Sequence, residues 1–187
     1  MATKIEKERF REMVEKWALI RGEVTLASGE KSAYYYDLKR VILNPKGGYL
    51  AGKLVLDLIP REGISCVGGY GLGGQLLAYN VMLVSGLENR PIDAFSVLTE
   101  SQIEEDGLQL VGIFSEGDVV AFVEDVVTKG GSIIKGIKIV EAAGGRVAKV
   151  VALLDRQQGG SERLREMGYD FSAILRSDAV GNLYINE

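Results

Sequence analysis

The sequence predicts one α/β domain with a mainly parallel central sheet flanked by helices. Short apolar segments rich in Val, Ile and Phe alternate along the chain with longer segments of helical period. Three of the apolar segments run directly into glycine-rich or charged sequences, the position where parallel sheets gather their ligands. With 187 residues, 47% of them hydrophobic, the chain can bury one core and is short for two domains.

The first half of the chain begins with an amphipathic helix over residues 4–20, because apolar residues recur there at helical spacing and Gly22 ends the pattern. Two short β-prone pieces follow, EVTLASG and SAYYYDL. Asn44 and Pro45 then introduce a helix, GGYLAGKLVLDLI. Next come a strand running into glycines, a helix ending at Gly86 and another strand: ISCVGGYG, GGQLLAYNVMLVSG and PIDAFSVL.

The second half opens with residues 99–118, which are mostly polar and predict a long loop or a hairpin. A strand, a helix and a strand follow: VVAFVED, GSIIKGIKIVEAAGG and VAKVVALLDR. LREMGY predicts a last short helix and FSAILRS a last strand. This alternation is typical of parallel strands joined by right-handed crossovers.

Composition excludes several classes of function. The net charge of −4 and the scattered Lys and Arg residues argue against nucleic acid as a partner. The N-terminal segment has no apolar signal core and no run long enough to cross a bilayer, so we expect no membrane association. The single cysteine, Cys66, lies in an apolar run as a buried thiol would, which suits a reducing cytoplasm. The chain has no histidine, so catalysis must use carboxylates, Lys, Tyr, backbone dipoles or an oxygen-bound metal.

GGYGLGG, residues 68–74, contains the pattern GxGxxG between a strand and a helix. A dinucleotide site also needs an acid at the end of the next strand, to bind the ribose. Asp93 lies at the start of that strand and Glu100 lies beyond its end. The pattern therefore favours a glycine turn that serves another anion or tight packing.

VEDVVTKGGS, residues 123–132, is the most informative stretch. Thr128, Gly130–Gly131 and Ser132 precede a helix and predict a nest of backbone N–H groups that holds a phosphate. Glu124 and Asp125 are placed to accept hydrogen bonds from ribose hydroxyls or to help hold Mg²⁺. A sugar phosphate satisfies both halves of the stretch. In the alternative, the two acids are solvated and the glycines form only a turn before a capped helix.

VAFVEDVVTKGGS resembles the phosphoribosyl pyrophosphate (PRPP) signature of type I phosphoribosyltransferases. Within that group the chain is most similar to the orotate enzymes, through TLASGEKSAYYYDLK (25–39) and VALLDRQQGG (151–160). The resemblance covers most of the chain in order. It implies a type I phosphoribosyltransferase fold, in which about residues 1–45 supply a helix and a small hood and about 46–187 the α/β core. It also implies Mg²⁺ as cofactor, PRPP and orotate or a related base as ligands, and a homodimer.

The resemblance also assigns site residues. It implies that PRPP contacts Glu124, Asp125, Val126, Val127, Thr128, Lys129, Gly130, Gly131 and Ser132, with the two acids on the ribose hydroxyls and, indirectly, the metal. It implies a pyrophosphate loop of Gly69, Tyr70, Gly71, Leu72, Gly73 and Gly74. The implied orotate contacts are Lys31, Tyr35, Tyr36, Thr128 and Arg156.

The chemistry of orotate supports the last set in part, since an Arg fork and an aromatic wall suit a planar carboxylate. The alternative for the tyrosines is core packing, because YYY at strand spacing must turn some rings inward. The alternative for Arg156 is a surface salt bridge with Asp155.

One segment departs from the family. The resemblance implies a mobile loop rich in Arg and Lys, with a His, that closes over the pyrophosphate, often across a dimer interface. Here residues 95–107 contain no Lys, Arg or His and include Glu100, Glu104, Glu105 and Asp106. Ala27 also replaces a family lysine, for which Lys31 could compensate. No catalytic residue can therefore be assigned from the family loop.

Preorganised cations are the main means of stabilising a leaving pyrophosphate, so the acidic segment bears on turnover. Mg²⁺, Lys129, Arg90 or a basic loop lent by a different subunit could supply the missing charge. Three hypotheses stay open. The chain is an orotate phosphoribosyltransferase that makes orotidine 5'-phosphate and pyrophosphate, or a PRPP- or nucleotide-binding paralogue with little catalysis. The third hypothesis is a dinucleotide-dependent oxidoreductase.

Overall fold

The computed structural model describes residues 3–25, 31–104 and 107–186. Its centre is a seven-stranded sheet of order β5-β4-β3-β6-β7-β8-β9. The inner strands β4, β3, β6, β7 and β8 are parallel, and the edge strands β5 and β9 are antiparallel to their neighbours. The strands are β3 (Cys66–Tyr70), β4 (Asp93–Val97), β5 (Leu110–Gly112), β6 (Val119–Val127), β7 (Arg146–Asp155), β8 (Phe171–Ser177) and β9 (Leu183–Ile185). The expected mainly parallel sheet is confirmed.

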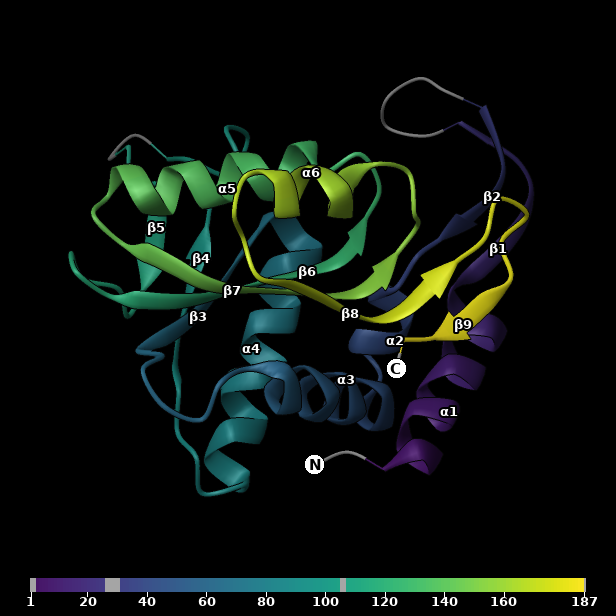
Figure 1. Ribbon diagram of the computed structural model, residues 1–187, viewed down its shortest axis with the longest axis horizontal. Coiled ribbons are helices and arrows are strands. Elements are labelled where there is room, and N and C mark those ends of the chain that lie inside the picture. Colours follow the sequence, from purple (N-terminus) through teal and green to yellow (C-terminus); the bar gives the residue numbers. More distant parts are fainter. Residues whose placement is uncertain (1–2, 26–30, 105–106, 187) are drawn as a thin grey trace.

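Helices cover both faces of the sheet (Figure 1). The strand residues alternate between two apolar cores, as the two-residue period of a strand requires. On one face, Ala121 and Val123 pack with α3 (Pro45–Leu58) and α4 (Gly71–Leu87). On the other face, Val120 and Phe122 pack with α5 (Gly131–Ala142) and α6 (Gly160–Glu166). Because both faces are covered, the inner strands carry central apolar runs, such as VVAFV in β6 and VVALL in β7.

The N-terminal helix is shorter than expected. Instead of continuing to residue 20, α1 (Lys4–Met13) passes into one π-helical turn, Val14–Ala18, and the chain then extends into β1 (Leu19–Thr25). The apolar residues that suggested a longer helix belong partly to this strand, where Ile20 pairs with Tyr35. β1 and β2 (Lys31–Tyr36) form a separate antiparallel sheet, which we call the hood.

Two short elements were not expected: α2 (Lys39–Ile42) and β9. FSAILRS is thus not the last strand. The segment 99–118 does form a hairpin-like return, since β5 pairs antiparallel with β4. α6 begins earlier than LREMGY suggested, because its first turn is the polar sequence GSER. α3 begins at Pro45, slightly before the expected GGYL, and the Asn44 side chain accepts from the N–H groups of Lys46 and Gly47.

The hood is attached to the turn between β8 and β9. The hydroxyl of Tyr34 donates to the backbone oxygen of Asp178 at 3.0 Å, and that of Tyr36 donates to the backbone oxygen of Gly181 at 2.8 Å. Both rings are buried and meet edge to face, with centroids 5.6 Å apart. Two tyrosines of YYY therefore pack in the core, which was one of the two interpretations of the sequence. They fix the hood beside the carboxyl end of the sheet.

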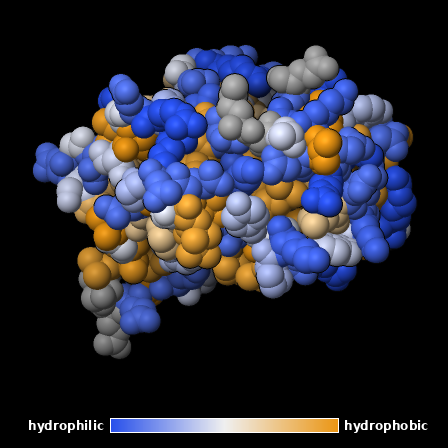
Figure 2. Space-filling view, turned by 90° about the horizontal axis from the view of Figure 1, so that it is seen from below, coloured by the Kyte–Doolittle hydropathy of each residue, from blue (hydrophilic) through white to orange (hydrophobic). Residues whose placement is uncertain are grey.

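The face formed by α3 and α4 carries exposed apolar side chains, and Figure 2 views the molecule from that side. Four of them lie on the C-terminal half of α4 and one on α3: Tyr79, Met82, Leu83, Leu87 and Tyr49. In the described ranges, no helix combines the length and apolarity that a membrane span requires.

Candidate functional site

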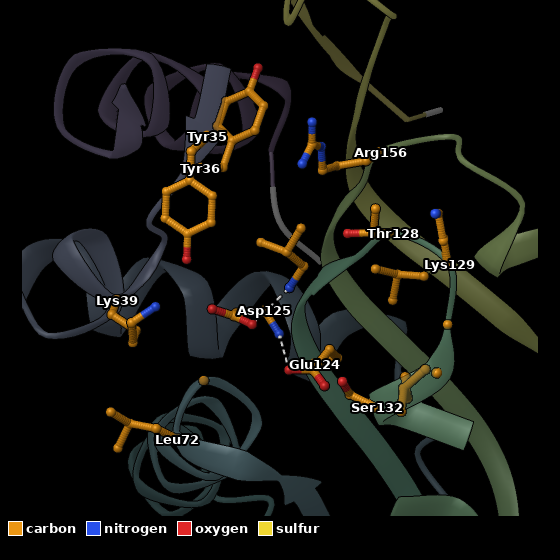
Figure 3. A pocket seen from close by; sticks show the side chains of 16 residues that line it. Tyr35, Tyr36, Lys39, Leu72, Glu124, Asp125, Thr128, Lys129, Ser132 and Arg156 are labelled. Atoms are coloured by element: carbon orange, nitrogen blue, oxygen red, sulfur yellow. Dashed lines mark hydrogen bonds between the residues drawn. The ribbon is translucent and has the colours of Figure 1, made fainter. Parts of the chain in front are cut away.

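A cavity of about 620 Å³ opens at the carboxyl end of β6, between the hood and the first turns of α4 and α5 (Figure 3). Its lining comes from the hood, α2, α4, the end of β6, the loop after it, the start of α5 and the residue after β7: Tyr35, Tyr36, Lys39, Leu72, Gly73, Glu124 to Ile133 and Arg156. All nine residues assigned to PRPP lie in this lining. Sequence segments more than 100 residues apart therefore meet at one site, where open parallel sheets bind their ligands.

Two carboxylates form the floor of the cavity. Glu124 is only 6% exposed and accepts from the N–H of Asp125 at 3.1 Å, and Asp125 accepts from the N–H of Val126 at 2.9 Å. Burial, and next the charge of Asp125, raise the pKa of Glu124 well above its ordinary value. The reading of Glu124 as a solvated strand end is therefore wrong. A buried Glu124 and a partly exposed Asp125 thus stand together at an acceptor site that a hydroxyl-bearing ligand could satisfy.

Glu124→Gln is expected to change how stability depends on pH. A carboxyl whose pKa is raised by folding binds more protons in the native state than in the unfolded state. Wild-type stability should therefore fall as pH rises from the ordinary carboxyl pKa through the raised one. Gln cannot ionise, so the unfolding free energy of the variant minus that of wild type should increase over this window, by at most about 1.4 kcal/mol per pH unit.

Urea unfolding at several pH values checks this expectation. Glu12, exposed on α1, offers Glu12→Gln as the matched change of Glu to Gln at the surface. A constant difference between Glu124→Gln and wild type across the window would contradict the argument.

Two helix N-termini point at the cavity from opposite sides of the carboxylates. Gly130 precedes α5 with φ +78°, which a side chain rarely adopts, and no side chain caps the helix. α4 likewise begins without a side-chain cap, and its Leu72 and Gly73 line the cavity. The first N–H groups of each helix have no partner within the helix and carry positive partial charge. The cavity thus offers two sites for anions, one on each side of Glu124 and Asp125.

The glycines of GGYGLGG allow close packing of the strand end against the helix start. A Cβ on Gly69 would lie 2.2 Å from the backbone oxygen of Gly74, so the strand end and the helix start touch through their backbones. Gly71 adopts φ +66° at the turn. Of the residues implied for the pyrophosphate loop, only Leu72 and Gly73 line the cavity. Gly69, Tyr70, Gly71 and Gly74 support them from behind.

Gly73→Ala is expected to lower the free energy of unfolding by about 1–3 kcal/mol. A Cβ at Gly73 would lie 2.4 Å from Cγ of Asp125, so either α4 or the carboxylate must move. Gly86, on the same helix, has open space around its Cβ position, and Gly86→Ala should stabilise by about 0.5–1 kcal/mol. Urea unfolding measures the stability of both variants. A Gly73→Ala protein as stable as wild type would show that α4 and the Asp125 carboxylate are less tightly packed than the structure indicates.

Arg156 follows β7 and enters the cavity on the hood side. It is 5% exposed, and its guanidinium lies over the Tyr34 ring at 4.6 Å from the centroid. Its Nε is buried without a hydrogen-bond partner, and within the described residues no carboxylate pairs with it. The surface salt bridge with Asp155 is therefore excluded. Asp155 instead accepts from the N–H of Gln157 at 2.8 Å.

Of the other residues implied to contact the base, three line the cavity and one does not. Tyr35, Tyr36 and Thr128 line the cavity with Arg156, and Tyr35 is the tyrosine of YYY that is not buried. Lys31 is exposed at the start of β2 and does not line the cavity. Ser28 and Gly29, which precede it, lie outside the described residues.

Lys39 is a cavity residue that the sequence reasoning missed. It stands on α2, and its Nζ lies 2.8 Å from a carboxylate oxygen of Asp37. The signal available was DLK, directly after the tyrosines. Arg90, which was considered as a source of positive charge, instead donates to the backbone oxygens of Leu56, Ile59 and Pro60, away from the cavity.

The acidic segment after β4 is held against α5. Glu100 forms an ion pair with Lys135 of α5, and Gln102 exchanges hydrogen bonds with Gln75 of α4 at 3.1 and 3.2 Å. None of the described residues of this segment lines the cavity. The carboxylate of Glu100 is thus neutralised locally, and Glu105 and Asp106 lie outside the described residues.

A divalent metal fits this site only together with a ligand. Within the described residues, no three acidic, His or Cys side chains converge as a set of metal ligands. Mg²⁺, however, is usually bound through one or two carboxylates, with phosphate oxygens of the substrate completing its shell. Glu124 and Asp125, between two anion sites, meet that requirement.

No family model matches the chain. The orotate phosphoribosyltransferase of Rhodopirellula baltica is 36% identical over 168 residues, which are 87% of this chain and 87% of that protein. The orotate phosphoribosyltransferase of Mycobacterium tuberculosis H37Rv, solved in complex with PRPP, superposes with a TM-score of 0.78 at 32% identity, covering 91% of this chain and 96% of that one. A phosphoribosyltransferase from Corynebacterium diphtheriae gives a TM-score of 0.81 at 29% identity over 92% and 96% of the two chains.

Proposed function

The chain belongs to the orotate phosphoribosyltransferase family, and from this premise we propose that it transfers phosphoribosyl from PRPP to orotate, with Mg²⁺ assistance, giving orotidine 5'-phosphate and pyrophosphate. In this reaction N1 of the base forms a bond to C1 of the ribose. The bond from C1 to the pyrophosphate oxygen breaks, its electron pair leaves with the pyrophosphate, and the N1 proton of the base is given up to it.

One observation in particular supports orotate as the base. Arg156 is a buried cation with an unpartnered Nε in the cavity, stacked on a tyrosine. A buried charge without a partner destabilises a protein, so such a residue indicates an anionic ligand. A planar pyrimidine carboxylate suits the guanidinium fork and the rings of Tyr35 and Tyr36. A site for PRPP alone gives Arg156 no role.

The remaining roles follow the geometry. The nest from Thr128 to Ser132, at the N-terminus of α5, would hold the 5-phosphate. Glu124 and Asp125 would accept from the ribose hydroxyls. Leu72 and Gly73, at the N-terminus of α4, would hold the pyrophosphate through their N–H groups. When bound, Mg²⁺ would neutralise charge on the phosphate oxygens, with Asp125 and Glu124 as its protein-side partners, directly or through water.

The test is release of pyrophosphate by purified protein given Mg²⁺, PRPP and orotate, followed together with PRPP binding by calorimetry. Release that depends on orotate is the expected result. Tight binding of PRPP without release would reject turnover and favour the second candidate, a PRPP-binding paralogue. The acidic composition of residues 99–106 is the observation that favours that candidate. Family membership leaves the dinucleotide-dependent oxidoreductase without support.

We also propose that residues 1–187 form one domain and that the chain is a homodimer. The first proposal is supported by the core, since Phe10 and Val14 of the N-terminal segment share one apolar cluster with Val67 and Leu175 of the sheet. The second is supported by the exposed apolar residues of α3 and α4 (Figure 2), because monomers rarely expose large apolar patches. Sedimentation analysis distinguishes a homodimer from a monomer, and a monomer would leave room for a different subunit that supplies a basic loop.

A further inference from the structure

The pyrophosphate end of the cavity needs positive charge that the acidic segment does not provide. Residues at the N-termini of α4 and α5 line the cavity, and the carboxylates stand between them. A ligand whose 5-phosphate lies in the nest before α5 and whose ribose lies over Asp125 must extend its other phosphates toward α4. Gly73 of α4 lies against the Asp125 carboxylate, which fixes that helix terminus beside the ribose position.

Lys39 stands on this side of the cavity. Figure 3 shows its side chain beyond Asp125, on the side of Leu72 and opposite Lys129 and Ser132. The described residues place three cations in the lining: Lys39, Lys129 and Arg156. Lys129 belongs to the nest before α5, and Arg156 lies over Tyr34 on the hood side. Of these three cations, Lys39 is therefore the one on the side of the cavity where α4 begins.

The side chain of Lys39 is oriented and charged before any ligand arrives. Asp37, two residues earlier, forms an ion pair with its Nζ at 2.8 Å and restricts where the ammonium can lie. Burial alone would lower the pKa of Lys39. The ion pair with Asp37 and the negative charge of Asp125 outweigh burial and raise that pKa. The lysine thus keeps its charge at neutral pH without a long, mobile loop.

We propose that Lys39 is a catalytic residue of this reaction, which contacts the pyrophosphate of PRPP and stabilises the negative charge that develops when the bond to C1 breaks. The proposal rests on the proposed function. It gives α2, the short helix that follows the hood, the role of supplying the cation, while α4 supplies backbone N–H groups. A preorganised cation at a leaving group needs no reorganisation during the reaction.

Lys39→Met tests the proposal, with Arg40→Met as the matched control. Arg40 lies on the same helix, also contacts Asp37 at 3.5 Å, and does not line the cavity. Calorimetry is done with two probes, inorganic pyrophosphate with Mg²⁺ and ribose 5-phosphate. Lys39→Met should weaken binding of pyrophosphate about tenfold or more and leave ribose 5-phosphate within about twofold. In the assay of pyrophosphate release, kcat should fall by about 10²- to 10³-fold, and Lys39→Arg should recover part of it.

The binding and release measurements distinguish failure of the proposed function from failure of the proposed role of Lys39. If wild type binds pyrophosphate but never releases it from PRPP and orotate, the proposed function fails while the binding role of Lys39 still stands or falls on the calorimetry. Unchanged pyrophosphate binding or unchanged kcat in Lys39→Met overturns the proposal, as does a wild type that does not bind pyrophosphate. Equal losses for both probes, or an equal effect of Arg40→Met, would assign Lys39 to the folding of the hood and overturn it as well.

Discussion

Arg156→Met is expected to lower kcat/KM for orotate by about 10²- to 10³-fold, while KM for PRPP stays near its wild-type value. Removing one partner of a buried charge pair costs about 2–5 kcal/mol, because the other charge loses its only compensation. The variant should fold, since Met fills similar space and removes a buried charge whose Nε has no partner in the described part of the chain. Arg156→Lys should recover little, because an ammonium lacks the bidentate fork.

The base itself supplies the sharpest control for Arg156. Uracil is orotate without the carboxylate, so wild type should strongly prefer orotate and Arg156→Met should lose that preference. Arg176→Met is the matched variant. Arg176 is exposed on β8, lies over the Tyr184 ring at 5.8 Å, and does not line the cavity. An undiminished preference for orotate in Arg156→Met would assign the carboxylate to another residue.

The order of elements in the core could be predicted because the local signals agree there. Asn44 and Pro45 mark the start of α3 by capping and by a fixed φ angle. Apolar runs such as VVALL mark strands that are buried on both faces. The elements that were missed are short and depend on tertiary contacts. β9 exists because it pairs with β8, and Leu19–Ile20 are extended because they pair with β2.

In the candidate site, too, some features could be predicted from the sequence and others depend on the fold. Residues 124–132 are contiguous, so one stretch of sequence was enough to identify the carboxylates and the nest together. Burial was not visible in the sequence. Glu124 and Arg156 each had a plausible reading as solvated surface charge, and only the fold shows that both are enclosed. Lys39 was missed for a related reason, since α2 turns the chain toward the cavity through contacts that periodicity does not encode.

Asp125→Asn is expected to weaken binding of Mg-PRPP by about 10- to 100-fold. Hydrogen bonds to a charged acceptor contribute about 1.5–3 kcal/mol, and Asn offers a neutral oxygen in place of a carboxylate. The fold should tolerate the change, because the Asn oxygen can still accept from the N–H of Val126, as Asp125 does at 2.9 Å. Calorimetry with Mg-PRPP measures the loss. Asp93→Asn, an exposed acid at the other end of the sheet, controls for the change in net charge.

Binding of a second ligand, ribose 5-phosphate, shows which part of PRPP depends on Asp125. Ribose 5-phosphate keeps the hydroxyls and the 5-phosphate but has no pyrophosphate, so Asp125→Asn should weaken it too, whereas Lys39→Met should not. Inorganic phosphate has no ribose hydroxyls, so Asp125→Asn should bind it like wild type. Unchanged affinity of Asp125→Asn for Mg-PRPP would remove Asp125 from the ribose. Loss for PRPP alone would instead indicate that its carboxylate acts through the metal on the pyrophosphate, on the side of the cavity where α4 begins.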